Sequence, residues 1–347
     1  MTTRKKIALY LVAAAILAVV AQTINHFRIH QLVTNQQTRE FFQNNKFMVG
    51  VNYPWVSYGS DFGDSYWGHV GVSDPATAAV VEHDFADLES QHITVVRWFL
   101  WANGHAGLTF AKDGSVSGLD KDFFADMNEA LEIAARHNIR IVFVLLDFKF
   151  FEGPQFGDFG NNWGGHAAVV SNAKIHMSFL NNAVRPLMQQ YGKSPVIAAW
   201  EVINEPELEL GFSVQNGRQS FSPGEMKDFV ASVAHIVHRY ADQPVTVGSL
   251  SRNLLWLWQG VGLDFYEAHS YPYTSFLEPV KMPLPLDRPT LLGEFPTKNG
   301  RMSVAGYLNQ AVQDGYQGAF PWSYRAPDNF SSFAGARKSI ARWQKTH

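Results

Sequence analysis

Apolar runs of strand length alternate with segments of helical period along most of the chain beyond residue 46. Residues 93–99 and 139–146 are almost wholly apolar, and a strand without polar alternation is typical of parallel sheets that are buried on both faces. Residues 122–137 follow a helical period instead, with one apolar face formed by Phe124, Met127, Leu131 and Ala134. The alternation therefore predicts a chain of the α/β class.

Eight strand candidates follow one another in this pattern, at residues 47–52, 93–99, 139–146, 196–203, 245–248, 263–269, 290–293 and 318–322. Helical segments separate most of them, at residues 75–91, 122–137, 171–191, 223–240, 303–314 and 332–345. This number and order predict a single (β/α)8 TIM barrel over residues 47–347 rather than a doubly wound sheet. No Gly-x-Gly-x-x-Gly follows the first strand, so a dinucleotide site would lack its phosphate-binding loop.

Two long irregular loops follow predicted strands, at residues 53–74 and 147–168. Both belong on the face of the barrel that carries active sites, because they follow the carboxyl ends of strands. These loops and the segment after the second strand provide three candidate sugar-contacting tryptophans, which are Trp55, Trp101 and Trp163. Such loops can wall a pocket or line an open groove, so exo and endo action both stay open.

The amino terminus has the layout of an export signal. Basic side chains at residues 4–6 precede an uncharged apolar run over residues 7–21. A basic segment followed by an apolar one is typical of a secretory signal peptide or a signal-anchor. We therefore assign residues 1–24 to targeting and expect the rest of the protein to be exported.

Two outcomes stay open for this segment. Cleavage near Ala21 would release the protein, whereas retention would anchor it to the cytoplasmic membrane, facing outward into the periplasmic or extracellular space. Contact with the membrane is expected only through residues 7–24, and only if they are not cleaved. Residues 25–46 are rich in polar side chains and lack a hydrophobic period, so we expect them to form a polar tether.

Composition narrows the classes of function. Lys and Arg total 28 and Asp and Glu total 31, giving a formal net charge of -3, and no basic stripe indicates a nucleic-acid partner. The chain has no Cys, which excludes disulfides, cysteine nucleophiles and thiolate metal sites and is compatible with an oxidising compartment. Its 10 Trp, 12 Tyr and 26 Phe provide flat rings that suit sugar faces and core packing alike.

Two carboxylates stand at the ends of predicted strands. Glu205 follows residues 196–203 within Asn-Glu-Pro, and Glu294 follows the short apolar strand at residues 290–293. The carboxyl ends of the fourth and seventh strands of a barrel open into the same cleft, so these two acids are expected to face one another. Glycoside cleavage requires such a pair, one carboxyl protonated and the other ionised.

Other polar and aromatic side chains occupy matching positions. Arg97 interrupts the second strand and, if buried, needs an anionic partner that an ionised Glu294 would supply. A hydroxyl donor such as Tyr271 would also help to keep that carboxylate ionised. The ends of the fourth, sixth and eighth strands add further candidates, which are Asn204, His269 and Trp322. Each residue alone has an ordinary structural explanation, but together, in this order, they favour a site.

At these residues the chain resembles clan A of the glycoside hydrolases, and within it the family 5 group that includes cellulases and β-mannanases. The resemblance extends over residues 47–343. It rests on Arg97, Asn204-Glu205-Pro206, His269-Ser270-Tyr271, Glu294 and Trp322. It implies a (β/α)8 barrel, retention of anomeric configuration and no metal or organic cofactor.

The resemblance also implies roles for the residues that match. Glu205 would be the general acid/base and Glu294 the nucleophile. The positioning and polarising of this nucleophile would fall to Arg97, His269 and Tyr271. Asn204 would contact the 2-hydroxyl of the sugar, and Trp322 would stack beneath the ring at the cleaved bond.

One position departs from the pattern of that group. Many members carry a His near the end of the third strand, where this chain has Asp147, so the sugar contact there stays open. Glu201 lies four residues before Glu205, and we interpret it as a buried structural acid rather than a third catalytic group.

The sequence thus predicts an exported, retaining, endo-acting O-glycosyl hydrolase for β-linked glycans of the mannan or glucan type. Two alternatives remain. A transglycosylase that remodels an exported or envelope polysaccharide would use the same residues, with an acceptor sugar in place of water. A membrane-tethered, non-catalytic glycan-binding barrel would keep the aromatic cleft without the chemistry. The sugar, the linkage and the oligomeric state stay open.

Overall fold

The computed structural model describes residues 36–42, 46–64, 70–156, 162–211, 221–272 and 286–346. The predicted targeting segment, residues 1–24, lies outside them, as does most of the predicted tether. No helix in these described ranges is long and apolar enough to cross a membrane.

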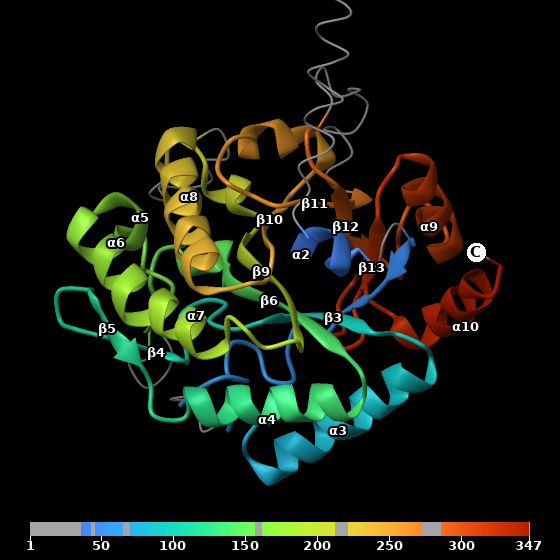
Figure 1. The fold of residues 1–347 in the computed structure, drawn as a ribbon, viewed down its shortest axis with the longest axis horizontal. Helices are drawn as coiled ribbons and strands as arrows, with labels where there is room; N and C mark the ends of the chain where they lie inside the picture. The colour runs from blue at the N-terminus through green and yellow to red at the C-terminus, as the bar shows by residue number, and fades with distance from the viewer. Residues whose placement is uncertain are drawn as a thin grey trace, which may run out of the picture.

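A parallel sheet occupies the centre of the molecule (Figure 1). Its strands are β1 (Met48–Val49), β2 (Val51–Asn52), β3 (Val95–Phe99), β6 (Arg140–Asp147), β9 (Ile197–Asn204), β10 (Val245–Ser249), β11 (Tyr266–His269), β12 (Thr290–Pro296) and β13 (Gly318–Trp322). Each strand of this sheet pairs in parallel with its neighbours, in the order β1-β13-β12-β11-β10-β9-β6-β3-β2.

The sheet closes into an eight-stranded ring at Gly50. This residue alone separates β1, which pairs with β13, from β2, which pairs with β3, so the two short segments are halves of one strand. The Gly50 amide donates to the carbonyl of Ala319 at 3.3 Å, which keeps the junction bonded. A side chain at residue 50 would overlap the ring of Phe320 inside the barrel, and this explains the glycine.

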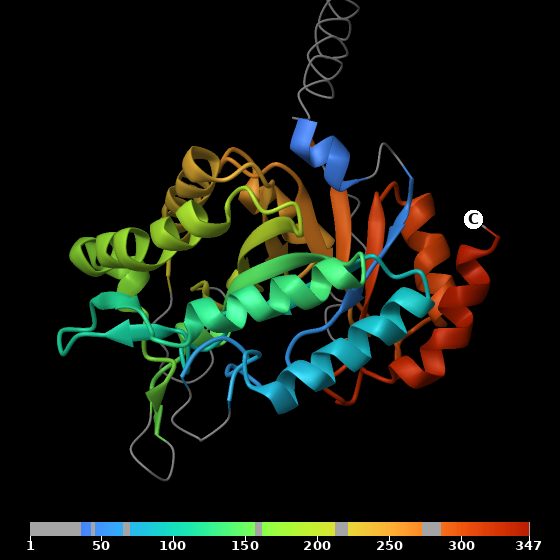
Figure 2. The same cartoon turned by 60° about the horizontal axis from the view of Figure 1, so that its bottom comes forward.

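Helices surround the ring (Figure 2). They are α3 (Pro75–Ser90), α4 (Phe123–Arg136), α5 (Ala168–Ser171), α6 (Ala173–Phe179), α7 (Arg185–Tyr191), α8 (Pro223–Tyr240), α9 (Val304–Gln313) and α10 (Phe333–Gln344). A π-helical segment, η3 (Leu180–Val184), joins α6 to α7. The start of α8 shows why helices begin where they do: Ser222 and Glu225 form a capping box around Pro223, whose missing N–H costs nothing in the first turn.

These elements confirm the predicted barrel, with most boundaries within two or three residues of the expected ones. The structure adds elements that no period in the sequence indicates. They are two hairpins, β4 (Leu108–Phe110) with β5 (Val116–Leu119) and β7 (Gln155–Phe156) with β8 (Asn162–Trp163), and three 3-10 segments, η2 (Phe148–Phe150), η4 (Pro206–Glu209) and η5 (Arg252–Trp258). All of them follow strands, on the side of the barrel where insertions are tolerated.

A short helix, α2 (Gln36–Phe41), lies within the segment that we expected to be a tether. It places Phe41 and Phe42 beneath the barrel, with ring centroids 4.9 and 5.3 Å from that of Phe265. Figure 2 shows this helix at one end of the strands. Aromatic rings that bury this much apolar surface stabilise the fold, so the last part of the segment is integral to the barrel.

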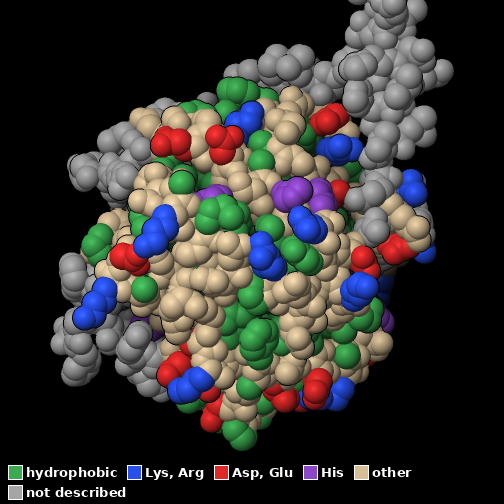
Figure 3. All heavy atoms as spheres, turned by 60° about the vertical axis from the view of Figure 1, so that its left-hand side comes forward, with side chains coloured by type: hydrophobic (Ala, Val, Ile, Leu, Met, Phe, Trp, Pro, Cys, Tyr) green, Lys and Arg blue, Asp and Glu red, His purple; other side chains and the backbone are tan. Residues whose placement is uncertain are grey.

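Surface charges are mixed. On the face drawn in Figure 3, Lys and Arg side chains are interspersed with Asp and Glu, and neither sign gathers into a stripe. A mixed surface of this kind creates no extended field that would attract a polyanion.

Candidate active site

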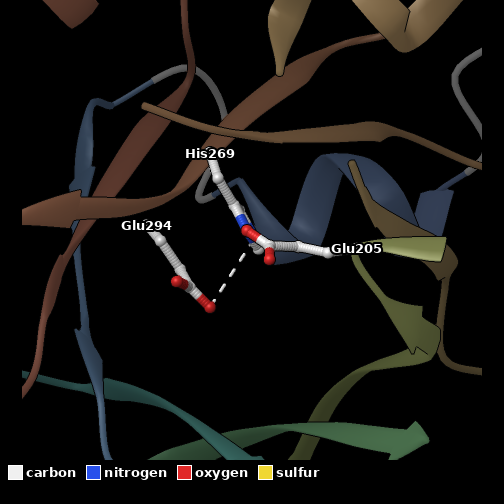
Figure 4. Close-up of side chains that lie close together, drawn as sticks. All are labelled: Glu205, His269 and Glu294. Atoms are coloured by element: carbon white, nitrogen blue, oxygen red, sulfur yellow. Dashed lines mark hydrogen bonds and ion pairs between the residues drawn. The ribbon is translucent and has the colours of Figure 1, made fainter. Parts of the chain in front are cut away.

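The two acids that the sequence singled out meet at the carboxyl end of the barrel. Glu205 directly follows β9, and Glu294 lies near the end of β12. An oxygen of each carboxyl group and a ring nitrogen of His269 lie within 4.8 Å of one another. Figure 4 shows the two carboxyl groups converging from opposite sides, although 89 positions (294 − 205) separate them in the chain.

Glu205 has an unusual backbone conformation. Its φ of 47° and ψ of 48° lie in the left-handed region, which costs a non-glycine residue free energy and persists only when its surroundings fix it. The next turn, η4, supplies one anchor: Glu207 accepts hydrogen bonds from the Leu250 amide at 3.0 Å, from Trp258 Nε1 at 2.7 Å and from the Ser249 hydroxyl. The acid is therefore held on a strained but well-anchored turn.

Arg97, on β3, links Glu294 to a second acid, Glu201, beneath the cleft. Its guanidinium is fully buried, and Nη1 donates to Glu294 Oε1 at 2.6 Å, as the sequence predicts for an anionic partner. Nε and Nη2 form a bidentate pair with Glu201 at 2.6 and 2.7 Å. The remaining two N–H groups reach Asn52 Oδ1 at 3.0 Å and Asn204 Oδ1 at 2.8 Å. Glu201 thus pairs with the arginine below the cleft, in keeping with a structural acid.

Tyr271 and His269 complete the contacts of the acids. The Tyr271 hydroxyl donates to Glu294 Oε2 at 2.7 Å, so this carboxylate has a strong donor on each oxygen. His269 Nδ1 lies 2.8 Å from Glu205 Oε1, whereas Nε2 lies 3.8 Å from Glu294 Oε1. The histidine therefore contacts Glu205 more closely than Glu294, on which the resemblance placed it. Burial lowers the pKa of His269 to about 4, so its ring is neutral near pH 7.

The surroundings separate the two acids electrostatically. Burial, and then the nearby Glu207 carboxylate, raise the pKa of Glu205 to about 8, so this carboxyl keeps its proton near neutrality. Burial also raises the pKa of Glu294, but the Arg97 charge and the Tyr271 hydroxyl donor oppose that rise. Because the ion pair and the hydroxyl donor belong to Glu294 alone, the ionised carboxylate belongs there and the proton on Glu205.

An aromatic cluster borders the acids. Trp322 at the end of β13 and Trp55 after β2 have ring centroids 6.0 Å apart, and Phe99, Tyr271 and Phe330 pack around them. Trp322 Nε1 donates to Asp328 at 2.8 Å, which fixes the indole plane. The structure thus places both tryptophans beside the acids, where a sugar face could stack.

A cavity of about 620 Å³ lies beside Trp55, between the loops that follow β2 and β13. Its polar lining includes Asp84, Ser331, Tyr324, Arg325 and Arg337. Arg325 pairs with Asp84 and Arg337 with Asp87, so these charges already have partners. The lining therefore offers hydrogen bonds in a largely neutral setting, which suits hydroxyl groups better than an anion.

The other two candidate tryptophans differ from Trp55. Trp101 is fully buried in the main core, with ring centroids 5.9 Å from Phe123 and 5.6 Å from Phe179, so the structure places it behind the barrel wall rather than at the cleft. The side chain of Trp163 lies outside the described part of the structure, and only its backbone is placed, in β8.

Three polar side chains that our sequence analysis did not single out also contribute. Asn52, at the end of β2, donates to the Gly293 carbonyl at 2.8 Å and accepts from Arg97. Glu207 anchors the turn of Glu205, and Glu267 on β11 lies beside Arg97. A signal existed for Glu267, because an acid inside an apolar strand and two residues before His269 has to face the barrel interior with it.

Asp147 stands at the end of the third barrel strand, β6, where many members of the family 5 group carry a histidine. Asp147 accepts a hydrogen bond from Asn204 Nδ2 at 3.2 Å, and burial raises its pKa to about 7. Since Arg97 donates to the other end of the same amide, the orientation of Asn204 is fixed from both sides. The residue that replaces the usual histidine thus helps to aim the asparagine.

Comparisons with known proteins agree with this geometry. The chain is 26% identical over 322 residues to mannan endo-1,4-beta-mannosidase of Mytilus edulis, covering 80% of this chain and 83% of that relative. It is also 26% identical over 330 residues to the enzyme of the same name from Cryptopygus antarcticus, covering 81% of each. No family model matches the chain.

Solved structures support the same fold. The β-mannanase of blue mussel, Mytilus edulis, has a TM-score of 0.68 at 22% identity, covering 87% of this chain and 92% of that one. The endo-1,4-beta-mannanase of Eisenia fetida has a TM-score of 0.69 at 22% identity, covering 85% and 90%. Together with the sequence relatives, these likenesses confirm the expectation of a glycosyl hydrolase and the resemblance of the chain to the family 5 group of clan A, which includes cellulases and β-mannanases.

Proposed function

We propose that the protein is a retaining endo-β-mannanase that cleaves by double displacement. The observation that carries the proposal is the convergence of Glu205 and Glu294 within 4.8 Å, with an arginine and a tyrosine hydroxyl on Glu294 alone. A retaining pair has its carboxyl groups about 5–5.5 Å apart, whereas an inverting pair leaves about 6.5–9.5 Å for a water molecule. The short separation supports retention.

In the first step, an oxygen of Glu294 attacks the anomeric carbon of the sugar that stacks on Trp322. The bond from that carbon to the glycosidic oxygen breaks, and Glu205 gives its proton to the leaving oxygen. The products are a shortened glycan and a covalent glycosyl-enzyme. The pKa of Glu205, about 8, keeps this proton available near neutral pH.

In the second step, the Glu205 carboxylate takes a proton from a water molecule as the water oxygen attacks the anomeric carbon. The bond to Glu294 breaks, and that carboxylate returns to its pair with Arg97. Two inversions give net retention. We expect the second N–H of the Asn204 amide to bind the sugar 2-hydroxyl, and the contacts with Arg97 and Asp147 that fix the orientation of the amide support this role.

The direction of the glycan follows from the positions of the acids. Glu205 lies after β9, and β13 is four strands away in either direction around the ring, so Trp322 stands across the barrel from the proton donor. The leaving group therefore extends over the β9 side. The sugars on the other side extend over Trp55 toward the cavity of about 620 Å³. A binding region for several sugars beyond Trp322 supports action within a chain rather than at its end.

Mannan is the proposed substrate because the relatives that cover most of this chain are named mannan endo-1,4-beta-mannosidases. Export is proposed from the sequence, on the basic and apolar pattern of residues 1–24. The protein would then meet its polysaccharide outside the cytoplasm, either released or held at the membrane by that segment.

The deciding experiment incubates the purified protein with linear β-mannan, galactomannan, β-glucan and mixed-linkage glucan and records product sizes over time. Endo-mannanase action predicts mixed short oligosaccharides from both mannans early in the reaction and little from the glucans. Release of single sugars alone would contradict endo action. Products longer than an oligosaccharide substrate would indicate transglycosylation, and binding without any product would reject the enzymatic proposal.

A further inference from the structure

Glu267 is a buried acid that the mechanism above does not use. It lies on β11, two residues before His269, and so faces the barrel interior beneath the cleft. Its side chain has no exposed surface, and neither carboxyl oxygen has a hydrogen-bond partner among the described residues. An ionised carboxylate without donors in such a place would cost several kcal/mol, so its charge state needs an explanation.

Arg97 is the nearest cation, and its donors are already used. Nε lies 3.2 Å from Glu267 Oε1, but the hydrogen on Nε points to Glu201. The two hydrogens on Nη1 and the two on Nη2 are taken by other acceptors, as described above. A guanidinium has five N–H groups, so none remains for Glu267.

The charges around Glu267 also disfavour its ionised form. The groups that face Glu267 are Glu201 from β9, Arg97 from β3, Glu294 from β12 and the neutral His269 from its own strand. Two of these are anions that hold hydrogen bonds from one cation. A third anion would leave the buried layer with a net charge of two units below zero.

From this donor count we propose that Glu267 keeps its proton at neutral pH and acts as an uncharged positioning residue beneath the nucleophile. It fills the space beside Arg97 without competing for its hydrogen bonds, and so the guanidinium stays directed at Glu201 and Glu294. Burial and the neighbouring Glu201 raise the pKa of Glu267 well above its ordinary value, in agreement with the geometry.

Space for this side chain is provided by glycine. A Cβ at residue 293, directly before the nucleophile, would overlap the Glu267 carboxyl group. A Cβ at residue 248 would likewise overlap the carboxyl group of Glu201. The backbone beside both acids is thus shaped to admit them, as expected for a layer in which each side chain has a fixed place.

Infrared spectroscopy tests the proton directly and requires no activity. The C=O stretching band of a protonated carboxylic acid is measured at neutral pH in a Glu205→Gln background, which removes the signal of the catalytic acid. Adding Glu267→Gln should remove one protonated-acid band and leave the carboxylate bands unchanged. Loss of a carboxylate band instead would overturn the proposal. Should the double variant fail to fold, total absence of a protonated-acid band in Glu205→Gln alone would overturn it equally.

Kinetics tests the positioning role, and this part rests on the proposed function. Glu267→Ala should lower kcat about tenfold because Arg97 loses its neighbour, and Glu267→Gln should restore most of that loss. The acidic limb of the pH profile should not move in Glu267→Gln. A shift of that limb to lower pH would show that Glu267 carries a charge. The matched control is Glu201→Gln, where the charge is needed and the amide should not rescue activity. If no mannan is cleaved by the wild type, the infrared result still decides the charge.

Discussion

At the amino end of the strands the barrel is filled by aromatic and aliphatic side chains, whereas at the carboxyl end it is filled by one arginine and several acids. The amino-end layer joins Phe41 of α2 and the adjacent Phe42 to Phe265, Phe320 and their aliphatic neighbours. The carboxyl-end layer holds the acids and the arginine, every one of them buried. Both layers are buried, but burial has opposite energetic consequences in the two.

Burying rings at the amino end stabilises the fold, at about 25 cal/mol per Å² of apolar surface removed from water. Burying charges at the carboxyl end costs free energy that hydrogen bonds only partly return. What the carboxyl end gains is a pair of carboxyl groups with different affinities for a proton. The comparison indicates that the apolar amino-end layer stabilises the barrel. This stability allows the carboxyl-end layer to keep buried charges whose desolvation costs free energy.

Removing the nucleophile should have the largest effect. We expect Glu294→Gln to lower kcat on mannan by about 10⁴-fold or more, because no other group can form the glycosyl-enzyme. The measurement is reducing-sugar release beside the circular dichroism spectrum, which should match the wild type. Residual turnover within tenfold of the wild type would mean that the acids do not act as described.

Removing an aromatic ring from the amino-end layer should lower stability and leave kcat unchanged. Phe265 is fully buried against the rings of Phe41 and Phe42, so Phe265→Ala should lower the free energy of unfolding by about 3–5 kcal/mol. Denaturant titration measures this, and kcat should stay close to the wild-type value below the unfolding transition. A large fall in kcat with unchanged stability would show that the two ends are not separable.

Replacing the proposed general acid, Glu205, should raise the free energy of unfolding, whereas Phe265→Ala should lower it. The unfolded state loses the Glu205 proton near pH 4.5, whereas the folded state keeps it up to about pH 8, so the wild type loses stability as pH rises between these values. Glutamine has no proton to lose, and Glu205→Gln should therefore raise the free energy of unfolding by about 4 kcal/mol at pH 8. At pH 4 the two proteins should be alike. Equal stability at both pH values would contradict the raised pKa.

The smallest effect is expected at the border of the cleft. Trp55→Ala should raise KM for mannohexaose several-fold, a loss of about 1 kcal/mol, and leave kcat nearly unchanged, since we propose that the ring contacts sugars away from the cleaved bond. A short aryl mannoside that does not reach Trp55 is the control substrate and should be unaffected. An equal loss on both substrates would place Trp55 at the reacting sugar.

The sequence predicted the barrel and the convergence of Glu205 and Glu294 because both depend on local patterns. A strand buried on both faces reads as an apolar run, and an acid directly after such a run has to lie at the carboxyl end, as Glu205 and Glu294 do. Trp101 illustrates the limit. It follows β3 as closely as a cleft residue would, but its ring packs against Phe123 of α4, and only the packed structure sets that direction.

The buried acid layer was harder to foresee. Glu267 stands in an apolar strand without any turn signal, and its importance depends on the five hydrogen bonds of Arg97, which come from strands far apart in the chain. Likewise, α2 follows no hydrophobic period. It folds there because Phe41 and Phe42 fill the open end of the barrel. This is a tertiary contact, and the local pattern of a six-residue segment does not predict it.

The close contact between Gly293 and Glu267 couples the substitutions that the two positions can accept. Even an alanine there would collide with the carboxyl group of Glu267, so protein engineering or natural drift can enlarge residue 293 only after residue 267 has been shortened. The reverse order is blocked, because the intermediate would displace the backbone that carries Glu294. A library that randomises residue 293 alone should return the parent glycine, whereas one that varies residues 267 and 293 together should yield new pairs.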